Sequence, residues 1–127
     1  MRRSMIAGNW KMNKTASEAP DLVRGIAAAA AESCAECVVC PSYLAIPAAL
    51  EAAVGTSVAV GAQDLFWKDS GAYTRQVAPG MLVDLGVSHV IIGHSERRAR
   101  FGVPEAGFTP EVLAHFGDSD TTVNLKL

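Results

Sequence analysis

The feature that most constrains the fold is a repeated alternation between short, β-rich apolar runs and longer stretches with helical spacing. This alternation predicts a parallel sheet whose strands are joined by right-handed helical crossovers. The expected strands occupy residues 5–9, 36–40, 57–62 and 87–93. The expected helices occupy residues 17–32, 45–54 and 79–85, with a segment at 109–116 and a further helix starting at Ser119. The sequence therefore predicts an α/β protein with one domain over residues 1–127.

Proline and glycine mark the boundaries of the expected helices. Ser17 is the expected N-cap of the first helix, and it places Pro20 in the first turn, where a missing N–H does no harm. Pro47 takes the same place in the second helix. Gly55 and Gly86 follow the second and third helices, where glycine favours a stop.

A parallel sheet must be covered on both faces, and this requirement limits the architecture. In an open arrangement of four strands, helices cover only one face unless the chain is doubly wound. In a closed (β/α)8 barrel of roughly 250 residues the other face fills the interior instead. With 127 residues, the chain has about half that length. We therefore expect the first four βα units of such a barrel.

Composition argues against several classes of partner. The formal net charge is −2 and 19% of residues are charged. The chain therefore lacks the excess of positive charge that is typical of nucleic-acid-binding proteins. Arg2 and Arg3 resemble the start of a signal peptide, but the apolar stretch from Met5 is interrupted at once by Gly8 and Asn9. No apolar run approaches the roughly 20 residues of a spanning helix. We expect a cytoplasmic protein with no nucleic-acid or membrane partner.

Three cysteines form a C-x2-C-x2-C pattern: Cys34, Cys37 and Cys40. Three thiols are an odd number for disulfides, and no nearby Cys or His cluster completes a tetrahedral metal site. Cys40 closes an apolar run that is typical of a buried strand, where cysteine acts as a small hydrophobic residue. We favour this structural interpretation over a metal or redox site and expect no bound metal.

Polar residues follow the expected strands at the edge where α/β folds place their active sites. Asn9 and Lys11 leave the first strand together, and this pair suits an oxygen-rich anion or a polarised carbonyl. His94 follows the fourth strand, where a neutral imidazole can donate a hydrogen bond to an oxygen that gains charge. Taken singly, each has a structural alternative, as a solvated lysine or a backbone-bonded histidine. His89 and His115 receive only the structural interpretation.

These strand-end segments together resemble motifs of the triosephosphate isomerase family. The two main matches are Ala7-Gly8-Asn9-Trp10-Lys11-Met12-Asn13 and Gly93-His94-Ser95-Glu96-Arg97-Arg98. Three further segments are similar to that family's second strand end, third strand and dimer loop: Cys40-Pro41-Ser42-Tyr43, Gly61-Ala62-Gln63-Asp64 and Ser70-Gly71-Ala72-Tyr73-Thr74. The resemblance covers the whole chain in the family's order and identifies it as the N-terminal half of a TIM barrel.

The resemblance implies an isomerase of glycolysis and gluconeogenesis that needs no cofactor or metal. It would interconvert dihydroxyacetone phosphate and glyceraldehyde 3-phosphate by proton transfer through an enediolate. By position, His94 is the implied electrophile. Lys11 would offset negative charge on the phosphate and the enediolate, and Asn9 would orient the substrate oxygen. Ser95 and Glu96 would be supporting groups.

The resemblance also implies a homodimer for the full-length protein, with Gln63 and Thr74 at the dimer loop. The sequence departs from the family there, because Arg75 and Gln76 stand where the family usually has Gly-Glu. Loss of that glycine is expected to strain a tight turn, and loss of the carboxylate removes a possible ion-pair partner. Dimerisation is therefore less secure than in the family.

The family's glutamate base follows its sixth strand, and its phosphate-binding loops follow strands seven and eight. None of these occurs in residues 1–127, so we expect little or no activity from the isolated chain. Glu96 is not expected to substitute, because in the family that position coexists with the base. Two alternatives remain: a half-barrel that binds or scaffolds without catalysis, and another phosphosugar enzyme on the same barrel.

Overall fold

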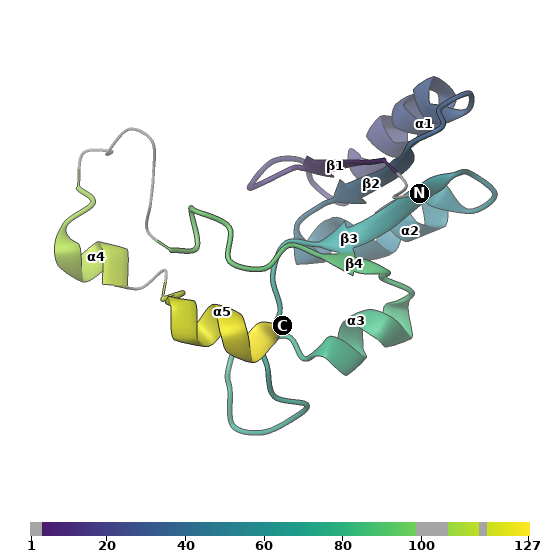
Figure 1. The fold of residues 1–127 in the computed structure, drawn as a ribbon. Coiled ribbons are helices and arrows are strands. Elements are labelled where there is room, and N and C mark those ends of the chain that lie inside the picture. The colour runs from purple at the N-terminus through teal and green to yellow at the C-terminus, as the bar shows by residue number, and fades with distance from the viewer. Residues whose placement is uncertain (1–3, 99–106, 115–116) are drawn as a thin grey trace. The chain divides into compact units, whose positions relative to one another are not determined.

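The structure is a computed structural model that describes residues 4–98, 107–114 and 117–127. The chain divides into two compact units, Met1–Ile91 and Ile92–Leu127. We call them the sheet unit and the C-terminal unit. Figure 1 shows the four strands and the first three helices of the sheet unit, followed by the two short helices of the C-terminal unit.

The sheet unit contains four parallel strands in the order of the sequence, as the βα alternation predicts. They are β1 (Met5–Asn9), β2 (Glu36–Cys40), β3 (Val58–Ala62) and β4 (His89–Val90). Asn9 pairs with Cys40 at the carboxyl ends of β1 and β2. The strand order leaves β1 and β4 at the edges of the sheet, as expected for the first half of a closed barrel.

The fourth strand is shorter than the expected 87–93. It pairs with β3 through His89 and Val90, and Ile91 adds one N–H bond to the Ala62 carbonyl. β3 ends at Ala62, so the residues that follow have no neighbouring strand to pair with. Gly93 then takes a positive φ of 67°, which breaks the extended conformation. The apolar run from Val87 therefore predicts a longer strand than the one that forms.

Three helices accompany the sheet: α1 (Ala19–Ala30), α2 (Ile46–Ala53) and α3 (Pro79–Leu85). Each has a proline in its first turn, as predicted, and a short 3-10 helix, η1 (Tyr43–Ala45), precedes α2. Gly86 ends α3 in the left-handed conformation with φ 98°. The sequence thus predicted the existence and order of these helices correctly.

The predicted N-cap of α1, Ser17, is wrong. The structure has Glu18 at this position, after a turn in which the Thr15 carbonyl accepts the N–H groups of Glu18 and Ala19. The Glu18 carboxylate in turn accepts the Thr15 N–H at 2.9 Å, and this bond helps hold the pKa of Glu18 below its usual value. Two residues earlier than expected, a Thr-x-x-Glu arrangement therefore organises the entry to the helix.

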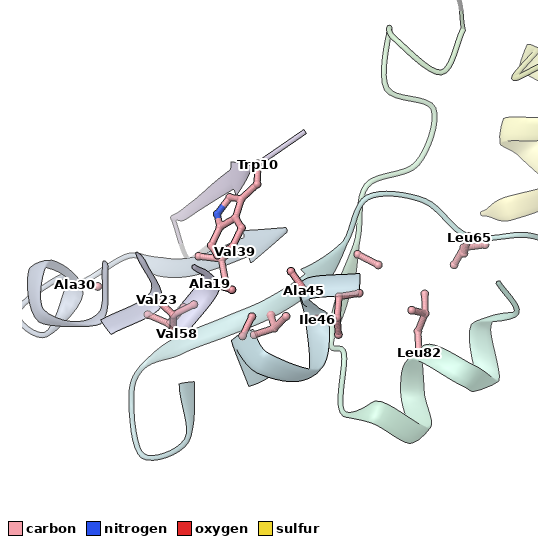
Figure 2. Packing of buried hydrophobic residues seen from close by; sticks show 13 residues of the cluster. Trp10, Ala19, Val23, Ala30, Val39, Ala45, Ile46, Val58, Leu65 and Leu82 are labelled. Atoms are coloured by element: carbon pink, nitrogen blue, oxygen red, sulfur yellow. The ribbon is translucent and has the colours of Figure 1, made fainter. Parts of the chain in front are cut away.

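One hydrophobic cluster forms the core of the sheet unit. α1 and α2 pack against each other and against β3. Figure 2 shows this packing, with Val23 of α1 close to Val58 of β3, and Leu65 facing Leu82 of α3. Ile46, the first residue of α2, is one of the largest side chains that are fully buried. The helices thus bury one face of the sheet, as expected for four βα units.

The C-terminal unit contains α4 (Pro110–Ala114) and α5 (Asp120–Lys126). Helix α5 starts where the sequence predicts, and Ser119 caps it, because its hydroxyl accepts the Thr122 N–H while the Thr122 hydroxyl accepts the Ser119 N–H. This reciprocal pair satisfies two N–H groups at the helix start. Leu127 lies just past α5 and not within it, and His115 falls outside the described residues.

The cysteines are free thiols and become progressively more buried along the chain. Cys34 is exposed, Cys37 is half-buried and Cys40 is buried. Within residues 4–98, 107–114 and 117–127, no group of His, Cys, Asp or Glu side chains is arranged to hold a metal ion. No helix of the described segments is long and apolar enough to cross a membrane.

Thiol alkylation is expected to distinguish the three cysteines. Burial raises the pKa of the Cys40 thiol, which lowers its thiolate fraction, and the surrounding strands block access. With iodoacetamide at pH 8, Cys34 should react first and Cys40 at least about tenfold more slowly. Peptide mass spectrometry over time measures the order, and the urea-unfolded chain, in which all three should react alike, is the control. Equal rates for Cys34 and Cys40 in the folded chain would contradict the burial.

Candidate active site

The first polar cluster lies at the carboxyl end of β1. The Asn9 side-chain oxygen accepts the Lys11 N–H at 2.9 Å, which closes a tight turn directly after the strand. Lys11 adopts a φ of 55°, in the left-handed region that residues with a Cβ rarely occupy. Because its oxygen is committed to this turn, the Asn9 amide presents its Nδ2 hydrogens as donors. An amide donor therefore lies at the end of β1, two residues before Lys11, and the joint role of Asn9 and Lys11 stays a prediction.

Gln63 stabilises this turn from the end of β3, which is separated from β1 by β2. It follows β3 directly, and its Nε2 donates to the Lys11 carbonyl at 2.8 Å and to the Cys40 carbonyl at 2.9 Å. The Asn13 side chain adds a bond from Nδ2 to the Trp10 carbonyl at 2.8 Å. The carboxyl ends of β1, β2 and β3 are therefore tied together by one amide. The predicted place of Gln63 in the dimer loop stays a prediction, and no sequence pattern indicated its bonds inside the sheet unit.

Replacing Gln63 is expected to loosen the Lys11 turn. Gln63→Leu keeps the size of the side chain but removes both donors, and at about 0.5–1.5 kcal/mol per hydrogen bond it should lower the free energy of unfolding by about 1–3 kcal/mol. Urea unfolding measures this change, and amide hydrogen exchange at Trp10 and Lys11 locates it. Gln76→Leu, in the loop before α3, is the matched control. Equal stability of the two variants would show that the Gln63 bonds contribute nothing.

The loop that contains Thr74 has the strain expected from its departure from the family. Arg75 adopts a φ of 74°, in the left-handed region where glycine carries no Cβ penalty. The Gln76 N–H donates to the Tyr73 carbonyl at 3.0 Å, which closes the turn around Thr74. The Tyr73 ring packs on Phe66 with centroids 4.8 Å apart. The loop therefore keeps a tight turn although arginine replaces glycine, and the dimer contact of Thr74 stays a prediction.

The second polar cluster is the turn that follows Gly93 in the C-terminal unit. The His94 carbonyl accepts the N–H groups of Arg97 at 2.9 Å and Arg98 at 3.2 Å, which makes residues 94–98 one helical turn. The Glu96 N–H donates to His94 Nδ1 at 3.2 Å. A nitrogen that accepts this bond carries no proton, so the neutral ring carries its proton on Nε2. His94 therefore offers an N–H donor on the ring edge away from the turn.

The supporting residues have different positions in this turn. The Ser95 carbonyl accepts the Arg98 N–H at 3.1 Å, so Ser95 stabilises the turn through its backbone. Glu96 Oε2 lies 3.5 Å from His94 Nδ1, on the side of the ring opposite Nε2. A carboxylate beside Nδ1 does not face a carbon whose adjacent oxygen is held by Nε2–H. This position does not suit a role as the base, and the supporting role of Glu96 stays a prediction.

The structure gathers the predicted residues into two groups, each within its own unit. Asn9, Lys11 and Gln63 form one group in the sheet unit, and His94, Ser95 and Glu96 form the other in the C-terminal unit. Sequence reasoning missed a buried ion pair in the C-terminal unit, between Asp118 and Lys126. A signal for it was present, because Lys126 follows Val123 by three residues and so shares the buried face of α5.

Parallel strands in sequential order define a partial (β/α)8 barrel. A sequence model of the family described as triosephosphate isomerase matches residues 4–122. The chain therefore belongs to the triosephosphate isomerase family.

Individual relatives agree with this assignment. The triosephosphate isomerase of Moorella thermoacetica is 53% identical over 116 residues, which are 91% of this chain and 47% of that protein. The same enzyme of Clostridium botulinum (strain ATCC 19397 / Type A) is 45% identical over 127 residues, which are 100% of this chain and 45% of that protein. A crystal structure of triosephosphate isomerase from Bartonella henselae is 40% identical, with a TM-score of 0.71 over 76% of this chain and 40% of that chain. The chain spans about half the length of the curated relatives it matches.

Proposed function

We propose that this chain supplies the carbonyl-polarising and anion-binding part of a triose-phosphate isomerase. The reaction interconverts dihydroxyacetone phosphate and glyceraldehyde 3-phosphate by moving a proton between adjacent carbons through an enediolate. The observation that carries the proposal is the hydrogen bond from the Glu96 N–H to His94 Nδ1. It supports an imidazole that is neutral and has its proton on Nε2, as a carbonyl-polarising donor requires.

The chemistry assigns a separate task to each group. Removal of the proton next to the substrate carbonyl places negative charge on the carbonyl oxygen. A fixed N–H donor that faces this oxygen stabilises the developing charge and lowers the barrier. His94 Nε2–H is that donor, and it can pass its proton to one enediolate oxygen and recover one from the other. Ser95 and Glu96 support the turn that presents the ring.

Lys11 and Asn9 bind the substrate in this proposal. The Lys11 ammonium offsets the charge of the phosphate and of the enediolate, and the Asn9 Nδ2 hydrogens orient a substrate oxygen. Gln63 fixes the backbone from which Lys11 projects. Holding the reacting groups in one geometry in this way can supply a large share of a catalysed rate.

The described residues provide no carboxylate that we assign as the proton-abstracting base. A base must come within hydrogen-bond reach of the proton that it removes, and the Glu96 carboxylate lies beside His94 Nδ1, not beside the Nε2–H that would hold the substrate oxygen. We therefore propose that the base and further phosphate contacts come from outside this chain's described residues. The wider proposal is a homodimeric cytoplasmic enzyme of glycolysis and gluconeogenesis, and it rests on membership of the family.

Ligand binding to the purified chain tests the proposal separately from turnover. The probe is 2-phosphoglycolate, whose carboxylate and phosphate imitate the charges of the enediolate. In two-dimensional NMR, millimolar concentrations should shift the amide signals of residues 9–13 and the ring signals of His94. Lys11→Met should abolish the shifts at residues 9–13. Lys14→Met, which removes a lysine paired with Glu18 in the same loop, should leave them unchanged.

A turnover assay completes the test. With dihydroxyacetone phosphate as substrate, the isolated chain should show no rate above the uncatalysed one. Turnover that disappears in His94→Gln would show that the chain contains its own base and would contradict that part of the proposal. An absence of NMR shifts at both His94 and Lys11 would contradict the binding role and favour a scaffold without catalysis.

A further inference from the structure

The C-terminal unit holds an ion pair that is almost completely removed from solvent. Lys126 Nζ donates to both carboxylate oxygens of Asp118, at 2.9 and 3.0 Å. The side chains of Lys126 and Asp118 are only 2% and 5% exposed. Removing two charges from water is costly, and such a pair has a defined geometry only where it is well bonded. The burial of this ion pair therefore calls for a structural explanation.

The position of Asp118 supplies that explanation. Its N–H donates to the Arg97 carbonyl at 3.0 Å, and its Oδ2 lies 3.8 Å from Arg97 Nε. Arg97 is part of the His94 turn, because the Arg97 N–H bonds to the His94 carbonyl. Asp118 therefore connects the backbone and the side chain of Arg97 to Lys126 of α5.

A second set of contacts holds the other end of the same turn. Arg98 Nε donates to the Gly93 carbonyl at 3.1 Å, and the Arg98 guanidinium pairs with Asp120. A Cβ at Gly93 would lie 2.7 Å from Val123 Cγ2, so α5 packs directly against this backbone. The residues before and after His94 are thus both fixed by the segment that contains Asp118 and α5.

We propose that Asp118 and Lys126 are positioning residues that hold the His94 turn, so that the Glu96 N–H meets Nδ1 and the ring proton stays on Nε2. The inference rests on the proposed role of His94 as an N–H donor. Lys126 compensates the charge of Asp118, and Asp118 fixes Arg97. The contacts that close the turn come from residues 118–126.

The test is the protonation state of the His94 ring, read from nitrogen-15 NMR of the full chain without substrate. The wild-type ring should show one proton-bearing nitrogen, Nε2, and one acceptor nitrogen, Nδ1. Lys126→Met keeps the length of the side chain but removes the ammonium that bonds both carboxylate oxygens of Asp118. It should produce a mixture of tautomers and roughly tenfold faster amide exchange at Glu96 and Arg97. Lys126→Arg should restore the wild-type pattern, whereas Leu125→Met, at an exposed position of the same helix, should not disturb it.

A double variant separates positioning from general stability. Asp118→Leu with Lys126→Met removes both charges, and replacement of a buried pair by apolar groups often preserves stability. If the pair positions His94, the double variant should unfold like the wild type but keep the mixed tautomers, because Arg97 has lost the Asp118 carboxylate. A wild-type His94 pattern in this variant would overturn the inference, as would a wild-type pattern in Lys126→Met.

The two proposals fail in different ways. If 2-phosphoglycolate shifts no signal of His94 while Lys126→Met still changes the ring tautomer, the isomerase role fails and the positioning role stands. If ligand binding is normal and the tautomer is insensitive to Lys126→Met, the positioning role fails alone.

Discussion

Ile46→Ala is expected to lower the free energy of unfolding of the sheet unit by about 2–5 kcal/mol, the range for truncating a fully buried isoleucine. Ile46 begins α2 and is 1% exposed within the cluster that joins the helices to the sheet. The cluster also contains side chains of α1, β2 and β3, which are fixed in their own elements and can close the resulting cavity only in part. Because small domains have about 5–15 kcal/mol of total stability, this single change removes a large share.

Leu44→Ala is the matched control for this measurement. Leu44 lies two residues earlier, in η1, and its side chain is 87% exposed. Its truncation should change the unfolding free energy by less than about 0.5 kcal/mol. Urea denaturation followed by circular dichroism gives both values. Similar midpoints for Ile46→Ala and Leu44→Ala would mean that α2 does not pack on the sheet as described.

Gly61→Ala is expected to destabilise the centre of the sheet by about 1–3 kcal/mol, the usual cost of overpacking. A Cβ on Gly61 would lie 2.8 Å from Cys40 Sγ of β2 and 3.2 Å from the His89 carbonyl oxygen of β4. The first contact is closer than real Cβ atoms tolerate, and the second is with backbone, which cannot rotate away. Because the clash involves both neighbouring strands, the added methyl should strain the sheet at β3, the strand that directly precedes Gln63.

Thermal unfolding measures this effect, with Gly8→Ala as its control. Gly8 is also in a strand, but a Cβ there would meet only the Val38 carbonyl oxygen at an ordinary 3.8 Å. For a unit of this size, 1 kcal/mol corresponds to a shift in Tm of roughly 4–8 °C. Adding Cys40→Ala to Gly61→Ala should recover part of the loss by removing Sγ. Equal Tm values for Gly61→Ala and Gly8→Ala would contradict the close packing of β2, β3 and β4.

Local patterns predicted most of the fold. β1 and β2 have the expected bounds because each is a short apolar run between polar residues. α3 begins at Pro79 and is stopped by Gly86, and both are residues whose backbone limits are intrinsic. The length of β4 was overestimated because a strand continues only while a neighbouring strand pairs with it. Where that neighbour ends depends on the folded sheet and not on the local sequence of β4. The N-cap of α1 was misplaced because Thr15, Ser17 and Glu18 offer competing caps.

The candidate site was predicted residue by residue, but its internal bonds were not. The position of Asn9, Lys11 and His94 after strands follows from the order of apolar runs. The bonds from Gln63 to Lys11 and from Asp118 to Arg97 join residues far apart in sequence. No local period encodes such pairs. They become visible only when the folded chain brings their backbones together.

The backbone of Lys11 has a consequence for the relation between folding and chemistry. A lysine in the left-handed conformation costs roughly 1–2 kcal/mol that a glycine would avoid. A glycine there would relax the turn after β1 but remove the only group at that position able to balance a phosphate. Local stability therefore favours glycine at position 11, whereas the charge of the ligand favours lysine. At this residue a strained backbone conformation is kept together with a cation at the strand end. Such a trade-off between stability and function is often found where binding residues have a strained backbone.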